Sequence, residues 1–93
     1  MKRRLLQSPR FKRRLRSWLK VHPETARDIE SALKAISHDD ADPSLKIHKL
    51  RGPLSGCWAC SAGYDLRIVF DYVEVDTEKM IRLLTLGTHD QVY

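Results

Sequence analysis

Residues 65–73, with the sequence DLRIVFDYV, decide the fold of this 93-residue chain. Apolar or aromatic side chains occupy every even position from 66 to 72, whereas Arg67 and Asp71 stand at odd positions. A period of two is typical of a β-strand with one buried face. These residues therefore predict a central strand of a sheet.

Two further segments have the same aliphatic and aromatic character, CWACS at 57–61 and KMIRLLTLG at 79–87. Gly63-Tyr64 and Asp76-Thr77-Glu78 separate them from the central strand and are rich in turn-forming residues. The three segments are therefore predicted to form an antiparallel meander. Residues 2–6 are a candidate for a fourth, short strand.

The first half of the chain has helical spacing instead. Ser8-Pro9 offers an N-cap residue followed by proline at the first helical position. His22-Pro23 ends this helix, because the residue before proline is pushed out of the α region. Its apolar face is expected to consist of Phe11, Leu15, Trp18 and Leu19.

A second helix is predicted over residues 23–37, followed by a polar connector at 37–45. Its inward residues are expected to be Ala26, Ile29, Leu33 and Ile36. Two helices joined by so short a turn form a helical hairpin. The expected fold is α+β, with an N-terminal helical hairpin packed on a twisted antiparallel sheet of three to four strands.

Composition is globular, with 42% hydrophobic and 31% charged residues, and residues 1–93 are expected to form a single domain. No apolar run approaches the roughly 18 residues of a membrane span, and the N-terminus has no apolar stretch long enough for a signal peptide. A cytoplasmic protein with no membrane partner is therefore expected. Its two cysteines should be reduced there.

Charge is distributed unevenly along the chain. Residues 1–20 contain nine basic and no acidic residues, whereas residues 21–93 contain eight basic and all twelve acidic residues. This asymmetry indicates a polyanion or an acidic partner, with a solvated helix face as the alternative interpretation.

Cys57 and Cys60 form a C-x-x-C motif. A redox motif of this kind should begin a helix, but strand-like sequence follows it. A zinc site would need two more ligands, and His48 and His89 are the only good candidates. Side chains three apart on a strand point to opposite faces, so these residues are expected to be buried strand cysteines, with no metal and no cofactor.

His48 and His89 lie beside glycine-bearing turns, HKLRG and GTHD, rather than on an apolar stripe. His22 and His38 are interpreted as surface histidines. Together with Asp65 and Arg67, His48 and His89 supply the groups needed to cut RNA without metal. A histidine can act as base or acid near neutral pH, and an arginine can stabilise the phosphorane.

Three stretches, HKLRG at 48–52 leading to Trp58, DLRIVF at 65–70 and GTHDQVY at 87–93, resemble the RelE/ParE superfamily of toxins, in particular its YafQ-like mRNA interferase branch. The first half fits more loosely, through Phe11 in a basic helix and His22-Pro23 before the second helix. The resemblance implies a helical hairpin on an antiparallel sheet. It also implies cleavage of mRNA in the ribosomal A site and a cognate antitoxin that holds the protein in a hetero-oligomer.

Matched position by position, the resemblance implies a catalytic set whose members are His48, Asp65, Arg67, His89 and Tyr93. The two histidines would share the base and acid roles in an order left open. Arg67 would hold the scissile phosphate, Asp65 would orient a histidine, and Tyr93 would stack on a base. Where YafQ-type enzymes place a further histidine, this chain has Ser61, which implies a simpler proton relay or a slower enzyme.

The sequence thus predicts a ribosome-dependent endoribonuclease whose RNA contacts are basic residues of the first helix and of the segment after His48. They are Arg10, Lys12, Arg13, Arg14, Arg16, Lys20, Lys49 and Arg51. Two alternatives stay open. One is a ParE-like toxin that poisons DNA gyrase, although such toxins lack the histidines. The other is an inactive module that only binds its antitoxin, which Ser61 slightly favours.

Overall fold

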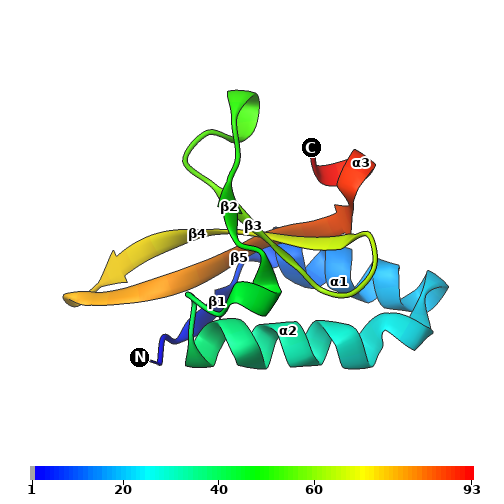
Figure 1. The fold of residues 1–93 in the computed structure, drawn as a ribbon, viewed down its shortest axis with the longest axis horizontal. Helices are drawn as coiled ribbons and strands as arrows, with labels where there is room; N and C mark the ends of the chain where they lie inside the picture. The colour runs from blue at the N-terminus through cyan, green and yellow to red at the C-terminus, as the bar shows by residue number, and fades with distance from the viewer. Residues whose placement is uncertain (1) are drawn as a thin grey trace.

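The computed structural model describes residues 2–93 and shows an α+β architecture (Figure 1). Its elements, in chain order, are β1 (Leu5–Gln7), α1 (Pro9–Val21), α2 (Ala26–His38), β2 (His48–Lys49), β3 (Trp58–Ser61), β4 (Leu66–Val75), β5 (Glu78–Thr88) and α3 (His89–Val92). One-turn 3-10 helices lie at Pro23–Thr25, Pro43–Leu45 and Gly52–Leu54. No helix among residues 2–93 is long and apolar enough to cross a bilayer.

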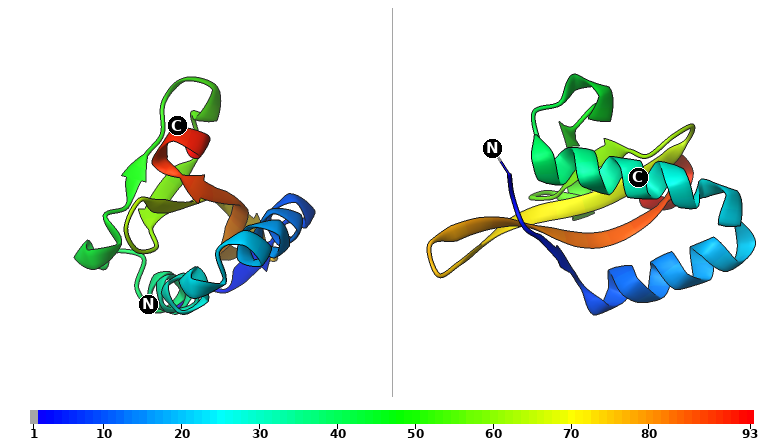
Figure 2. Two further views of the ribbon diagram at one scale, coloured as in Figure 1. Left: turned by 90° about the vertical axis from the view of Figure 1, so that its right-hand side faces the viewer. Right: turned by 90° about the horizontal axis from the view of Figure 1, so that it is seen from below.

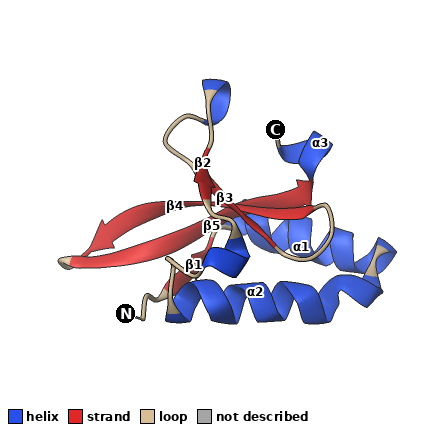
Figure 3. Ribbon diagram, viewed as in Figure 1, coloured by secondary structure: helices blue, strands red, loops and turns tan. Residues whose placement is uncertain are grey.

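The five strands form one mixed sheet in the order β1-β5-β4-β3-β2 (Figure 3). β1 pairs with β5 in parallel, and the other neighbours are antiparallel. The α+β class is confirmed, but the prediction of an antiparallel sheet of three to four strands was wrong. β2 has only two residues, too few for alternation to show, and the direction of β1 depends on pairing with a strand more than 70 residues away.

α1 begins as predicted, because the Ser8 hydroxyl accepts a hydrogen bond from the Phe11 N–H at 3.1 Å and Pro9 follows the cap. α2 begins at Ala26 rather than at residue 23, because residues 23–25 form a 3-10 helix. In this turn the Thr25 hydroxyl donates a hydrogen bond to the His22 carbonyl at 2.7 Å. Ala26 is exposed, and Ala32 is buried instead. A third helix, α3, follows the sheet, so the helices are not confined to the N-terminal part.

α1 and α2 cover the same face of the sheet (Figures 1 and 2). Phe11 of α1 and Ile36 of α2 are fully buried against Ile68 and Phe70 of β4. Burial of each such side chain stabilises the fold by about 1.5–3 kcal/mol. The loop between β2 and β3 and helix α3 stand on the opposite side of the sheet, which we call the open face (Figures 1 and 2).

Candidate active site

Strand register places a row of small and polar residues on the open face. Ser61 of β3, Arg67 of β4 and Gly87 of β5 lie directly opposite one another. Residues opposite in antiparallel strands point to the same side. Leu66 and Ile68 point to the helices and are buried there, so Arg67 projects onto the open face. This is the physical basis of the alternation in residues 65–73.

Gly87 allows α3 to fold back over this row. A Cβ atom at Gly87 would lie 2.7 Å from Gln91 Oε1 and 3.3 Å from Val92 Cγ1, so a larger residue would fit only if the Gln91 side chain or α3 shifted. Thr88 caps the helix in a capping box: its hydroxyl accepts from the Gln91 N–H at 3.3 Å, and Gln91 Oε1 accepts from the Thr88 N–H at 2.9 Å. The helix thereby carries His89 and Tyr93 over the sheet.

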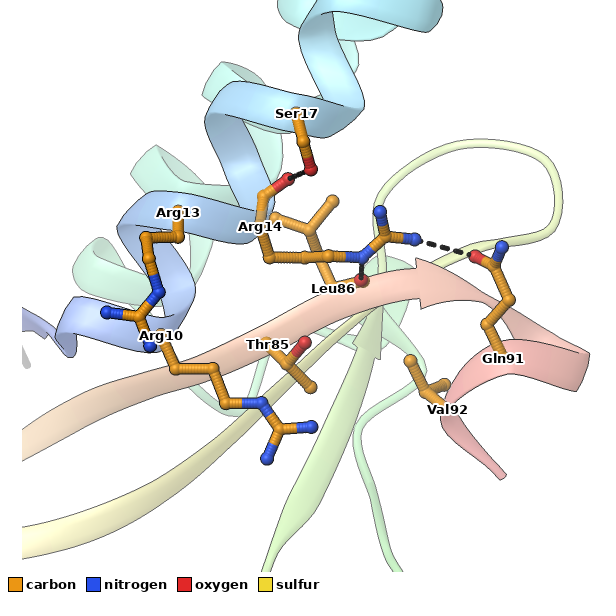
Figure 4. Close-up of a pocket in the computed structure, with 8 residues that line it drawn as sticks. All are labelled: Arg10, Arg13, Arg14, Ser17, Thr85, Leu86, Gln91 and Val92. Carbon is orange, nitrogen blue, oxygen red and sulfur yellow. Dashed lines mark hydrogen bonds between the residues drawn. The ribbon is translucent and has the colours of Figure 1, made fainter.

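Arg14 connects α1 to α3, as Figure 4 shows. Its Nε donates to the Leu86 carbonyl of β5 at 3.0 Å, and its Nη2 donates to Gln91 Oε1 at 3.0 Å. Its guanidinium also lies 5.3 Å from the ring of Trp18. Arg14 was predicted to contact RNA, but the structure engages it in these internal contacts. Sequence reasoning missed Gln91, although the pattern Thr88-x-x-Gln91 is a recognisable capping signal.

Tyr93 lies between the two candidate histidines. Its hydroxyl is 2.7 Å from Nε2 of His48, and the two ring centroids are 5.5 Å apart. The His89 ring packs edge-on against Tyr93 with a centroid distance of 4.3 Å. Residues 45 positions apart in the chain, His48 and Tyr93, therefore meet at one point of the open face.

The contacts of His48 fix its neutral tautomer. Nδ1 lies 3.0 Å from the Lys46 carbonyl oxygen, which can only accept a hydrogen bond. Nδ1 must therefore carry the proton, so that Nε2 of the neutral ring is unprotonated and has a lone pair that can accept. That lone pair accepts the hydrogen bond of the Tyr93 hydroxyl.

Burial raises the pKa of Tyr93, while the charge of Arg67 and a hydrogen bond from it oppose the rise. The phenol is therefore protonated at neutral pH and is the donor toward His48. Arg67 projects from the middle of the sheet on the row that α3 covers, opposite Gly87. Arg67 also donates from Nη1 to the Leu66 carbonyl at 3.0 Å.

Asp65 contacts the backbone of His89 rather than its imidazole. Its carbonyl oxygen and its Oδ1 accept from the His89 N–H at 3.1 Å and 3.4 Å. Asp65 has a φ of +59°, which an aspartate tolerates better than most residues. It therefore helps to place α3, and the structure shows no contact through which its carboxylate would orient either histidine ring within residues 2–93.

His48 and Tyr93 line a cavity of about 460 Å³, which we call the His48 cavity. The loop between β2 and β3 forms one wall with Arg51 and Leu54, and α3 forms the other with Gln91. Mixed apolar and basic walls of this kind suit a nucleotide, whose base is apolar on its faces and whose phosphate is anionic.

The remaining predicted RNA contacts are on the surface. The exposed residues of this set are Arg10, Lys12, Arg13, Arg16, Lys20, Lys49 and Arg51. Figure 4 shows Arg10 and Arg13 on the face of α1 that adjoins β5 and α3, where they line a hollow of about 400 Å³. The Lys49 ammonium lies 5.3 Å from the ring of Trp58.

Cys60 of β3 is fully buried, and Cys57 precedes the strand and is half-buried. Burial raises the pKa of the Cys60 thiol to about 12, so it is protonated at neutral pH. Both thiols are free. Within residues 2–93, no three His, Cys, Asp or Glu side chains are grouped as they would be around a metal ion.

Comparison with models of known protein families gives no match, and neither does comparison with curated protein sequences. Solved structures do match. A YoeB/ParE toxin from Agrobacterium tumefaciens has a TM-score of 0.72 at 14% identity, over 92% of this chain and 98% of that one. The toxin–antitoxin complex DinJ–YafQ from E. coli matches with a TM-score of 0.73 at 14% identity, over 100% of this chain and 99% of the other.

A toxin from Helicobacter pylori matches with a TM-score of 0.68 at 22% identity over 100% of both chains. These likenesses extend over nearly the whole chain. They show that the chain shares the fold of the YoeB/ParE and YafQ toxin structures.

Proposed function

We propose that this protein is the toxin of a type II toxin–antitoxin system and that it cuts mRNA on the ribosome without a metal ion. The observation that carries the proposal is the meeting of His48, Tyr93 and His89 over Arg67, a residue set that provides a base, an acid and a phosphate-binding cation. The fold, shared with YoeB and YafQ toxins, supports the same function.

His48 acts as the general base in this mechanism. The hydrogen bond at Nδ1 keeps Nε2 unprotonated, and the Tyr93 hydroxyl that Nε2 accepts from at 2.7 Å marks where a substrate hydroxyl would bind. The ribose 2′-hydroxyl takes that position, gives its proton to Nε2, and attacks the adjacent phosphorus. Tyr93, once released, stacks on a base.

His89 acts as the general acid. The bond from phosphorus to the 5′-oxygen breaks as the 2′-oxygen bond forms, and His89 protonates the leaving 5′-oxygen. Arg67 stabilises the negative charge on the phosphorane between them. The products are a 2′,3′-cyclic phosphate and a 5′-hydroxyl. The step consumes no water. One proton passes from the 2′-hydroxyl to His48, and one passes from His89 to the 5′-oxygen.

Two kinds of macromolecular partner follow from this proposal. The exposed cations of α1 would contact ribosomal RNA, which places the protein in the cytoplasm. A cognate antitoxin would bind the protein in a hetero-oligomer, as DinJ binds YafQ in the matched complex.

The termini of the RNA fragments test the reaction. In a translation system to which the purified protein is added, upstream fragments should end in a 2′,3′-cyclic phosphate and downstream fragments should begin with a 5′-hydroxyl. A message with a single 2′-deoxynucleotide at the mapped cut position should resist cleavage there. Downstream fragments with a 5′-phosphate, or cleavage of the deoxy message, would refute the mechanism.

A further inference from the structure

A second cavity on the molecule, of about 550 Å³, lies at the turn between β3 and β4, and we call it the Tyr64 cavity. Its walls include Lys46, Ser61, Tyr64 and Arg67. Arg67 also stands opposite Gly87, over which α3 folds back, and its charge opposes the rise in the pKa of Tyr93, which lines the His48 cavity. The candidate phosphate-binding arginine therefore lines the Tyr64 cavity and lies beside the His48 cavity, and the mechanism proposed above uses only the His48 cavity.

Tyr64 is the most exposed large hydrophobic side chain among the described residues, with a relative accessibility of 102%. An aromatic ring that projects from the surface in this way buries no area in the fold. Its stacking face is therefore available to a ligand.

The turn that presents Tyr64 is held from both sides. The Ala62 N–H donates to the Leu66 carbonyl at 2.9 Å, and the Asp65 carbonyl accepts from the His89 N–H at 3.1 Å. Gly63, with a φ of +97°, packs so closely on Asp28 that a Cβ there would lie 2.7 Å from Asp28 Oδ2. The backbone that presents the Tyr64 ring is consequently held in place and tied to α3.

Charge in the Tyr64 cavity favours an anion. Lys46 and Arg67 contribute two cations, and the one acid of its lining, Asp65, turns Oδ1 toward the His89 N–H. Lys46 is exposed, while its carbonyl holds His48 Nδ1 at 3.0 Å, so its position is coupled to that of the candidate base. An aromatic platform beside cations is how proteins hold single-stranded RNA.

We propose that the Tyr64 cavity binds the nucleotide next to the one in the His48 cavity, on the other side of the scissile phosphate. Tyr64 stacks on its base, and Lys46 pairs with its outer phosphate. Arg67 then lies between two nucleotide-binding cavities, each lined by a tyrosine and a lysine. These are Tyr93 and Lys49 in the His48 cavity, and Tyr64 and Lys46 in the Tyr64 cavity. This inference rests on the proposed function and adds a second substrate contact to it.

The test measures the Kd of the protein for ribosomes programmed with an mRNA that has one 2′-deoxynucleotide at the cut position and is therefore not cleaved. Y64A should weaken binding roughly 5- to 150-fold, the range for loss of one base–aromatic stack. Y64F keeps the ring and should bind as wild type does. V21A, which truncates another exposed apolar side chain, is the matched control and should have no effect.

An abasic site in the message identifies the base. With an abasic site at the nucleotide that occupies the Tyr64 cavity, either the 5′ or the 3′ neighbour of the cut phosphate, Y64A and wild type should bind equally. If Y64A binds the intact message as tightly as wild type, the inference is wrong. If Y64A instead loses only antitoxin binding and binds ribosomes as wild type does, Tyr64 belongs to a protein interface and the inference is wrong. A wild-type protein that cuts no mRNA would overturn the proposed function itself.

Discussion

Replacing Arg14 by Gln should loosen α3 from the sheet. The change removes two hydrogen bonds from a charged donor, to the Leu86 carbonyl and to Gln91 Oε1. Hydrogen bonds to charged groups contribute about 1.5–3 kcal/mol each, but solvent replaces part of this at a half-exposed site. We therefore expect α3 to dock less tightly by about 1–3 kcal/mol, which raises the detached fraction roughly 5- to 150-fold.

Amide hydrogen exchange measures that fraction directly. The Tyr93 N–H is bonded to the His89 carbonyl at 3.1 Å only while the α3 turn is formed, so its exchange should accelerate by the full factor. The cleavage rate should change by a smaller factor than the exchange rate, because it is proportional to the fraction of molecules in which α3 is docked with His89 and Tyr93 in place. Arg14→Lys should restore only part of the protection, since lysine cannot reproduce the two-pronged contact.

Arg13→Gln is the matched control. Arg13 directly precedes Arg14 on α1 and is exposed, so the Tyr93 amide should exchange at the wild-type rate in this variant. Equal exchange at Tyr93 in Arg14→Gln and wild type would refute the assignment of Arg14 as the residue that positions α3.

Three further predictions concern stability and charge. Burial would raise the pKa of Asp40, but hydrogen bonds from Tyr72 and Arg3 hold it below its ordinary 3.8. Asp40→Asn should therefore lower the free energy of unfolding by about 1–3 kcal/mol at pH 7, and the deficit should shrink as the pH falls below about 4, measured by urea titration. Thr77 has a φ of +66°, a conformation that costs a β-branched residue about 1–2 kcal/mol. Thr77→Gly should therefore raise the melting temperature by several degrees, since each kcal/mol corresponds to about 4–8 °C. An unchanged or lower melting temperature would contradict this. Changing Arg13 and Arg16 to Gln should reduce the salt slope of ribosome binding by about 1.4–1.8, and an unchanged slope would show that they contact no RNA phosphate.

Much of the fold could be predicted because it is encoded locally. The alternation over residues 65–73 identifies β4, and Ser8-Pro9 and His22-Pro23 mark the ends of α1. The pairing of β1 with β5 could not be predicted, since it depends on backbone partners that no local period records. Val69, at an odd position, is buried on the open face as well, where it lines a hollow with Leu54 of the β2–β3 loop and Val92 of α3; this covering depends on long-range packing that the alternation does not record.

The candidate site shows the same division. Residue type and resemblance select His48, His89 and Tyr93, and the structure brings them together. Their catalytic roles stay predictions. The tautomer of His48 could not be predicted, because it depends on a carbonyl of the loop two residues earlier. The internal role of Arg14 could not be predicted either, because the sequence does not distinguish it from the neighbouring basic residues until α1 is packed beside β5.

The most direct test of the account replaces the leaving 5′-oxygen of the mapped cut site by sulfur, in a message bound to ribosomes. On the ordinary message, His48→Ala and His89→Ala should each reduce cleavage by roughly 10²–10⁴. A thiolate leaves without protonation, so on the sulfur message His89→Ala should regain most of the wild-type rate, and His48→Ala should stay slow. Wild-type rates for both variants on the ordinary message, or recovery of His48→Ala alone, would contradict the account.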